Sequence, residues 1–115
     1  MALTVEFYEH NGTQFEVEFQ RGSNGEIALS GRCYSGPISV GSRFLYLIKL
    51  QWVRDDPSNP YLIKTNIILI DMTVVGVEAY HKRIDAIYSP MTGRLFVTGV
   101  GVELIERGDV VSNIK

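Results

Sequence analysis

The stretch of sequence that decides the fold runs from residue 43 to residue 70 and reads RFLYLIKLQWVRDDPSNPYLIKTNIILI. Over 43–53, apolar side chains occupy every second position, a period that is typical of a β-strand. They are Phe44, Tyr46, Ile48, Leu50 and Trp52. Residues 61–70 are similarly apolar, and the polar segment 54–60 between them, with its two prolines, predicts a loop. The stretch therefore predicts a long antiparallel hairpin with strands over 43–53 and 61–70.

Both faces of this predicted hairpin are apolar. Opposite Phe44, Tyr46, Ile63 and Ile67 lie Leu45, Leu47, Leu62, Ile68 and Ile70. A small barrel covers only its inner face, so we expect the second set to meet solvent, another layer or another molecule. Part of that set is expected to be covered by an N-terminal hairpin that supplies Val5, Phe7, Phe15 and Val17. The remainder, with Trp52, Tyr61 and the tip 54–60, predicts a surface for a protein partner or a second copy of the chain. A thicker, self-contained core is an equal alternative.

Alternation of the same kind extends to both sides of the stretch. It predicts a hairpin over 3–20 that turns at Asn11-Gly12, and a connection over 21–25. Further strands are predicted over 26–34, 38–40, 73–80, 84–87, 94–100 and 109–111. Glycines fall at the segment ends, as the corners of a closed sheet require, and no window has a convincing helical period. We therefore expect an all-β fold, a small antiparallel closed barrel forming a single domain over 1–115, with a sandwich as the alternative.

The composition is that of an ordinary globular chain. Of 115 residues, 45% are hydrophobic and 21% are charged, and the formal net charge of −2 disfavours RNA, because nucleic-acid binding relies on neutralising phosphates. The single cysteine, Cys33, cannot form an internal disulfide and is expected to be a small buried hydrophobe. The N-terminus lacks the features of a signal peptide, and no apolar run is long enough for a transmembrane helix. We expect a cytoplasmic protein that does not bind membranes.

Residues that could carry chemistry do not form a recognisable constellation. The two histidines, His10 and His81, are far apart in the sequence, and no acidic or cysteine partner recurs at metal-ligand spacing. Asp55 and Asp56 lie in a Pro-Ser-Asn loop, where solvated turn residues are expected rather than paired catalytic carboxylates. The sequence therefore predicts no catalytic residues, no metal and no cofactor.

Three segments carry a more specific signal. Residues 31–41 read GRCYSGPISVG, residues 73–85 read TVVGVEAYHKRID, and residues 105–111 read IERGDVV. Together, in this order and spacing, they resemble the second domain of translational GTPases such as elongation factor Tu. The resemblance covers roughly residues 26–112 and implies a β-barrel.

In that family the second domain helps to hold the aminoacyl end of tRNA or docks on ribosomal RNA. The resemblance implies binding roles for Glu78, Tyr80 and His81, with His81 standing in place of the family's usual basic residue. The chain contains no phosphate-binding loop, so GTP binding and hydrolysis do not carry over. We expect a stand-alone, non-catalytic binding or adaptor module that meets a protein through Trp52, Tyr61 and its loops. A translation-linked RNA or ribosome-binding domain is the alternative, and an enzyme whose site has no motif is less expected.

Overall fold

The computed structural model describes residues 12–23 and 26–114, and almost all of their regular structure is β-strand. The strands are β1 (Gln14–Ser23), β2 (Glu26–Ser35), β3 (Ile38–Ser39), β4 (Arg43–Val53), β5 (Tyr61–Ala79), β6 (Lys82–Arg83), β7 (Ala86–Ile87), β8 (Thr92–Val100) and β9 (Val110–Ser112). One 3₁₀ turn, η1 (Val102–Leu104), lies between β8 and β9, and the described residues contain no α-helix. None of the described segments forms a helix long and apolar enough to cross a membrane.

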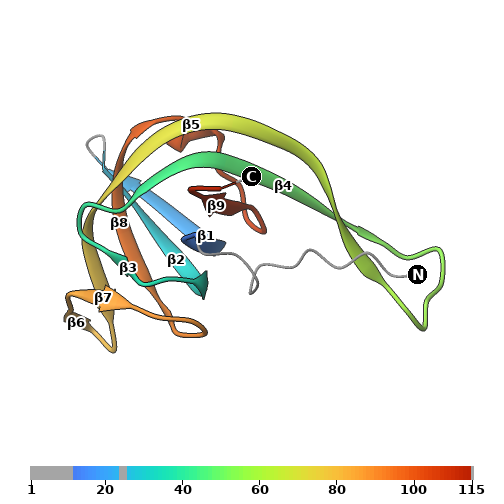
Figure 1. The fold of residues 1–115 in the computed structure, drawn as a ribbon, viewed down its shortest axis with the longest axis horizontal. Helices are drawn as coiled ribbons and strands as arrows, with labels where there is room; N and C mark the ends of the chain where they lie inside the picture. Colours follow the sequence, from blue (N-terminus) through green and yellow to red (C-terminus); the bar gives the residue numbers. More distant parts are fainter. Residues whose placement is uncertain (1–11, 24–25, 115) are drawn as a thin grey trace.

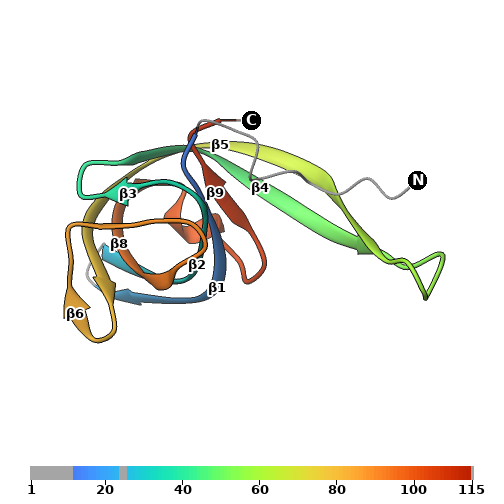
Figure 2. The same cartoon turned by 60° about the horizontal axis from the view of Figure 1, so that its bottom comes forward.

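Six strands form a closed antiparallel barrel. Their order is β4-β9-β1-β2-β8-β5, and the pairing of β5 with β4 closes the circle. Figure 2 looks into this barrel, with β3 and β7 paired across one end. Ile38 of β3 and Ile87 of β7 belong to the main hydrophobic core, so this small sheet closes that end. The prediction of an all-β fold with a small closed antiparallel barrel is confirmed, and the sandwich alternative is wrong because one continuous sheet closes on itself.

The predicted strands agree with the structure at most positions. The hairpin with strands over 43–53 and 61–70 is confirmed, with Val53 opposite Tyr61 beside the loop. The predicted break between 70 and 73 is wrong, because β5 runs without interruption through 19 residues. The predicted connection over 21–25 is wrong for residues 21–23, which continue β1 and pair with β2. The first strand of the hairpin over 3–20 lies outside the described residues.

The residues that face the barrel core on the long hairpin are not all the predicted ones. The cause is a register shift between β4 and β5, between Phe44 and Tyr46. Phe44 and Leu47 are both fully buried in the main core, although they are three positions apart. Tyr46 and Ile48 lie instead in a second, smaller cluster. The prediction that Phe44 and Tyr46 share a face is therefore wrong, because an irregularity of this kind reverses the alternation of side chains.

The surplus apolar side chains of β5 are also not the predicted ones. Ile70, predicted to be surplus, is buried in the barrel core, whereas Ile67 and Leu69 are exposed. Phe15 and Val17 were predicted to cover the outside of the long hairpin, but both are fully buried inside the barrel. The apolar surface that the hairpin leaves uncovered thus includes the side chains of Ile67 and Leu69.

Cys33 is a core residue, as predicted. Its thiol is fully buried and donates a hydrogen bond of 3.4 Å to the carbonyl oxygen of Ser35. Burial raises the pKa of this thiol to about 11, and the hydrogen bond offsets only part of that effect. The thiol is therefore protonated at neutral pH and inaccessible from the surface.

Candidate functional site

Half of the β4–β5 hairpin extends beyond the barrel. β9 pairs with β4 only over Tyr46–Ile48, and β8 pairs with β5 only from Asp71 onward. From the pair of Lys49 with Asn66 outward, the two strands pair with each other and with no other described strand, as a two-stranded ribbon closed by the loop 54–60 (Figure 1). We call residues 49–70 the arm; its ribbon is 49–66, and its root, 67–70, lies beside the part of β4 that pairs with β9, with Ile70 buried in the barrel core. It accounts for the elongated shape of the molecule, which measures 42 × 24 × 23 Å.

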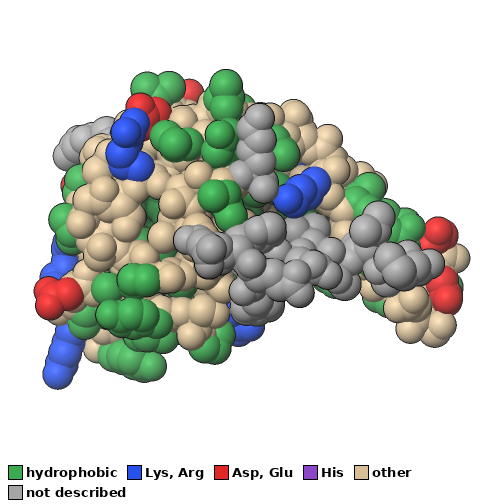
Figure 3. Space-filling view, viewed as in Figure 1, with side chains coloured by type: hydrophobic (Ala, Val, Ile, Leu, Met, Phe, Trp, Pro, Cys, Tyr) green, Lys and Arg blue, Asp and Glu red, His purple; other side chains and the backbone are tan. Residues whose placement is uncertain are grey.

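The outer part of the arm carries the two aromatic residues that the sequence singled out. Trp52 is 50% exposed and lies opposite Leu62, while Tyr61 is half-buried opposite Val53. The guanidinium carbon of Arg54 lies 5.4 Å from the centre of the Trp52 ring, within range of a cation–π contact. Figure 3 shows hydrophobic side chains on the arm next to the acidic side chains of its tip. The arm thus presents aromatic, aliphatic and charged groups together.

The tip of the arm is shaped by an aspartate turn. The Asp56 carboxylate accepts hydrogen bonds from the Ser58 amide, at 3.1 Å, and from the Ser58 hydroxyl, at 2.7 Å. These bonds lower the pKa of Asp56, and the neighbouring Asp55 is exposed and accepts a bond from the Asp56 amide. The prediction that both aspartates are solvated turn residues is confirmed.

The root of the arm is held to the barrel by a lysine. Lys49 Nζ lies 2.6 Å from Asp109 Oδ2 and 2.9 Å from Glu106 Oε1, and it donates a further bond of 3.0 Å to the Leu104 carbonyl. Burial alone would lower the pKa of Lys49, but the hydrogen bonds and negative charges of Asp109 and Glu106 outweigh it and raise the pKa. Lys49 is therefore firmly protonated and joins the first residue of the arm to the η1–β9 segment.

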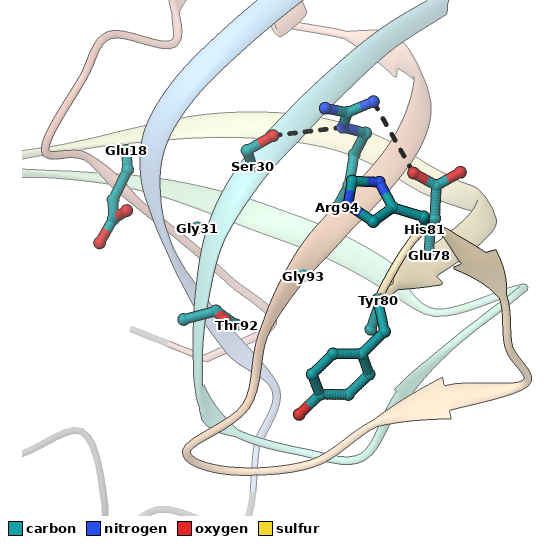
Figure 4. Close-up of a pocket in the computed structure, with 10 residues that line it drawn as sticks. Glu18, Ser30, Gly31, Glu78, Tyr80, His81, Thr92, Gly93 and Arg94 are labelled. Carbon is teal, nitrogen blue, oxygen red and sulfur yellow. Dashed lines mark hydrogen bonds and ion pairs between the residues drawn. The ribbon is translucent and has the colours of Figure 1, made fainter.

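A pocket lies on the barrel wall, on the side away from the arm. Its volume is about 290 Å³, and it includes three of the residues that the resemblance marked, Glu78, Tyr80 and His81. Figure 4 shows these side chains together with others from β1, β2 and β8. The remaining lining residues are Glu18, Ser30, Gly31, Ala79, Thr92, Gly93 and Arg94.

Two glycines allow the barrel wall to bend inward beneath this pocket. Gly31 of β2 pairs with Gly93 of β8. A β-carbon on Gly31 would lie 1.8 Å from the Glu16 carbonyl oxygen, and one on Gly93 would lie 2.8 Å from the Glu78 carbonyl oxygen. Since neither space admits a side chain, the backbone of neighbouring strands approaches closely on the inside of the barrel, and the outside is hollowed.

The rim of the pocket is the tight turn between β5 and β6. Its two central residues, Tyr80 and His81, have φ angles of 54° and 62°, in the left-handed region that non-glycine residues seldom adopt. Two successive residues of this kind form the type of turn that suits the twist of a β-hairpin. This conformation costs on the order of 1 kcal/mol for each residue. The Tyr80 ring in this turn projects into solvent.

Charges in the pocket are partly paired. Arg94 Nε donates a hydrogen bond of 3.3 Å to the Ser30 hydroxyl, and its Nη1 lies 3.8 Å from Glu78 Oε1. Glu18 forms no ion pair with any residue that the structure describes. Among the described residues, no group of three or more His, Cys, Asp or Glu is placed to hold a metal ion. The pocket contains both acidic and basic side chains that can form hydrogen bonds. It contains no thiol, since Cys33 lies in the core.

The five sequence-predicted binding residues fall into two separate groups. Trp52 and Tyr61 lie on the arm, and Glu78, Tyr80 and His81 line the pocket. Sequence reasoning missed the pocket residues Glu18, Ser30, Thr92 and Arg94. Ser30 and Arg94 are register partners on β2 and β8, so only a prediction of strand pairing could have brought them together.

The chain matches no model of a known protein family and no curated protein sequence. The closed barrel is compatible with the resemblance to the second domain of translational GTPases, which rests on the three sequence segments alone. Function has therefore to be argued from the arm and the pocket themselves.

Proposed function

We propose that this protein is a non-catalytic binding module that docks on protein through its arm. The observation that carries this proposal is the ribbon formed by residues 49–53 and 61–66, which pairs with no other described strand. A two-stranded ribbon is marginally stable in water, because one pair of strands buries little apolar surface. An arm of this length is stabilised when a partner covers it.

The chemistry of the arm suits a protein partner. Trp, Tyr and Arg are the residue types that contribute most to protein–protein binding when they become buried. Trp52, Arg54 and Tyr61 lie close together beside the tip, and the contact between Arg54 and Trp52 restrains both side chains before binding. Restraint of this kind lowers the entropic cost of association.

Several observations support a non-catalytic role. A nucleophile needs an accessible, ionisable group, and the Cys33 thiol is buried with a pKa of about 11. Asp55 and Asp56 are exposed and bonded within their own loop. In the pocket, Arg94 Nη1 lies 3.8 Å from Glu78 Oε1, so this carboxylate already has an ion-pair partner.

The test is a variant in which the arm is shortened. Leu50 and Lys64 are register partners, so replacing residues 51–63 with Asn-Gly joins them by a two-residue turn and leaves the pairings of β4 with β9 and of β5 with β8 untouched. We expect this variant to keep the β-type circular dichroism spectrum of the barrel and to lose protein binding. The matched control is Tyr80→Ala, which removes an exposed aromatic ring away from the arm.

Binding is measured by capture from a ribonuclease-treated lysate at about 0.1 M and about 0.5 M salt, since contacts between apolar surfaces persist where phosphate contacts weaken. Proteins retained at both salt concentrations by the wild type and by Tyr80→Ala, but not by the shortened variant, support the proposal. Equal retention by the folded shortened variant contradicts it.

RNA binding at the pocket is a second candidate function. The observation that favours it is that Glu78, Tyr80 and His81, which correspond to binding positions in the resembled family, line one pocket with Arg94. An exposed aromatic ring beside an arginine suits a stacked base and its phosphate. If this candidate holds, a fluorescent single-stranded RNA binds with an affinity that falls steeply with salt and is weakened by Arg94→Ala and Tyr80→Ala. Binding that neither variant changes rules out the pocket as the RNA site.

A further inference from the structure

We propose that the partner of the arm is a second copy of this chain, joined by antiparallel pairing of the two β5 strands along residues 61–70. This inference rests on the proposed function, because it names the partner that the arm binds. The two copies would form one continuous four-stranded ribbon in which each β5 lies in the middle, and the two-fold axis would pass near Thr65.

The first observation is a long strand edge that no described strand pairs with. Over 61–70, β4 lies on one side of β5, and no described strand lies on the other until β8 begins to pair at Asp71. At about 3.3 Å per residue this edge is about 30 Å long. Natural edge strands are usually protected by charges, prolines or short length. This edge has one charged residue, Lys64, and no proline.

The second observation is that the polarity of this edge is self-complementary. Residues 61–63 are apolar, residues 64–66 are Lys, Thr and Asn, and residues 67–70 are apolar again. When an identical strand runs antiparallel to it, with Ile63 opposite Ile68 of the second copy, residues 61–63 of each copy face 68–70 of the other. Thr65 then faces Asn66 in the middle, and Lys64 faces Ile67. A contact in which the same surface is used by both copies is the form that two-fold dimers adopt. Apolar cross-strand pairs stabilise such a ladder.

The third observation narrows the choice of register. Lys64 lies opposite Leu50 and Asn66 opposite Lys49, so Thr65 is an extra residue on β5. An extra residue reverses the direction in which the backbone hydrogen-bonding groups point on its two sides. When Ile63 lies opposite Ile68 of the second copy, the edge amides and carbonyls on both sides of Thr65 can hydrogen-bond with those of the antiparallel strand. The same register places Leu62 opposite Leu69 of the second copy.

The fourth observation is the exposed apolar surface that flanks this edge. Leu69 is 74% exposed, and Ile67 is exposed on the same strand. Val100, which lies opposite Asp71 where β8 stops, is 71% exposed. Ile67 and Leu69 belong to the strand that a second copy would pair with, and Val100 lies at the barrel end of this edge. Covering them removes apolar surface from water, which favours association.

The test uses two variants with opposite charges. The acidic variant carries Leu62→Glu and Leu69→Glu, and the basic variant carries Leu62→Lys and Leu69→Lys. In the proposed register each variant places like charges directly opposite one another in its own dimer, whereas a mixed dimer pairs Glu with Lys. Val40→Glu is the matched control, because Val40 is an exposed apolar residue outside the arm. Circular dichroism confirms that each variant keeps the fold.

Molar mass is measured by light scattering at about 100 μM, where a dimer with a micromolar Kd is mostly assembled. We expect twice the chain mass of 12.9 kDa for the wild type and for Val40→Glu, the chain mass for each charged variant alone, and twice the chain mass for their equimolar mixture. A monomeric wild type overturns this inference, as does a dimer that the charged variants leave intact. A monomeric wild type that still captures another protein through its arm overturns the self-pairing alone and leaves the proposed function standing.

Discussion

The ammonium nitrogen of Lys49 lies 2.6 Å from a carboxylate oxygen of Asp109, and this contact ties the root of the arm to the segment that enters the closing strand of the barrel. The Lys49 side chain is 19% exposed and that of Asp109 is 7% exposed. The same Asp109 oxygen also accepts a hydrogen bond of 2.8 Å from the Glu106 amide. The pair therefore fixes both the ribbon and the turn before β9.

Replacing Lys49 by Met is expected to destabilise the fold, because it leaves the carboxylate of Asp109 buried without its cation. The loss is about 3 kcal/mol in the free energy of unfolding, the amount typical for removing one member of a buried ion pair. Arg43→Met is the matched control, since the Arg43–Asp71 pair is more than half exposed and contributes less than about 1 kcal/mol. Urea denaturation measures both values. Equal effects of the two substitutions would show that the Lys49 pair is not a structural anchor.

The contribution of Lys49 to stability is expected to depend on pH in one direction. Its pKa in the folded protein is raised above the ordinary value of 10.5, so the folded state holds the proton more tightly than the unfolded state. The stabilisation is therefore complete below pH 10.5 and is lost as the pH rises through the folded-state pKa. The measurement is the difference in Tm between wild type and Lys49→Met from pH 8 to pH 12. A difference that grows above pH 10.5 would contradict the direction of this pKa shift.

Cys33 is expected not to react with a thiol reagent in the native protein. Its thiol is buried and its pKa is about 11, so at pH 8 less than about 1% of it is thiolate even if it were accessible. Reaction with a chromogenic disulfide is followed with and without denaturant. We expect full labelling only in the unfolded protein. Rapid labelling of the native chain would mean that the core around Cys33 opens readily.

Gly31 is expected to be intolerant of any side chain. A β-carbon there would lie 1.8 Å from the Glu16 carbonyl oxygen, which is held in the sheet and cannot move aside. Gly31→Ala should therefore cost at least about 2 kcal/mol, as overpacking does in rigid surroundings. In Gly22→Ala the new carbon meets only the Ile27 side chain at 3.5 Å, so this control should stay near wild-type stability. A similar denaturation midpoint for the two variants would contradict the close approach of β1 and β2.

Much of the fold follows from local sequence patterns, but the inward faces of the long hairpin do not. Alternation of apolar residues predicts the strands over 43–53 and 61–70, because the period of a strand is local. The register shift after Phe44 and the extra residue Thr65 arise from pairing between strands and have no local signal. For this reason the sequence pattern places Ile70 on the outside and Ile67 on the inside, the reverse of what the structure shows.

The two candidate sites were predictable to different degrees, because the arm depends on local sequence and the pocket depends on pairing between strands. Trp52 and Tyr61 flank a loop that composition alone predicts, so their position on the arm could be inferred. The pocket brings together residues of β1, β2, β5 and β8, and its hollow depends on the pairing of Gly31 with Gly93. Glu18 and Arg94 are 76 positions apart in the sequence and line one pocket only because β2 pairs with both β1 and β8.

The measurement that tests the role of the arm most directly is amide hydrogen exchange at two protein concentrations, about 1 μM and about 100 μM. If copies of the chain pair along β5, amides of residues 61–70 exchange several-fold more slowly at the higher concentration, while those of β2 and β8 in the barrel wall do not change. The acidic variant with Leu62→Glu and Leu69→Glu should show no such dependence. Exchange over 61–70 that is identical at both concentrations, in a wild type whose barrel is protected, would contradict association through the arm.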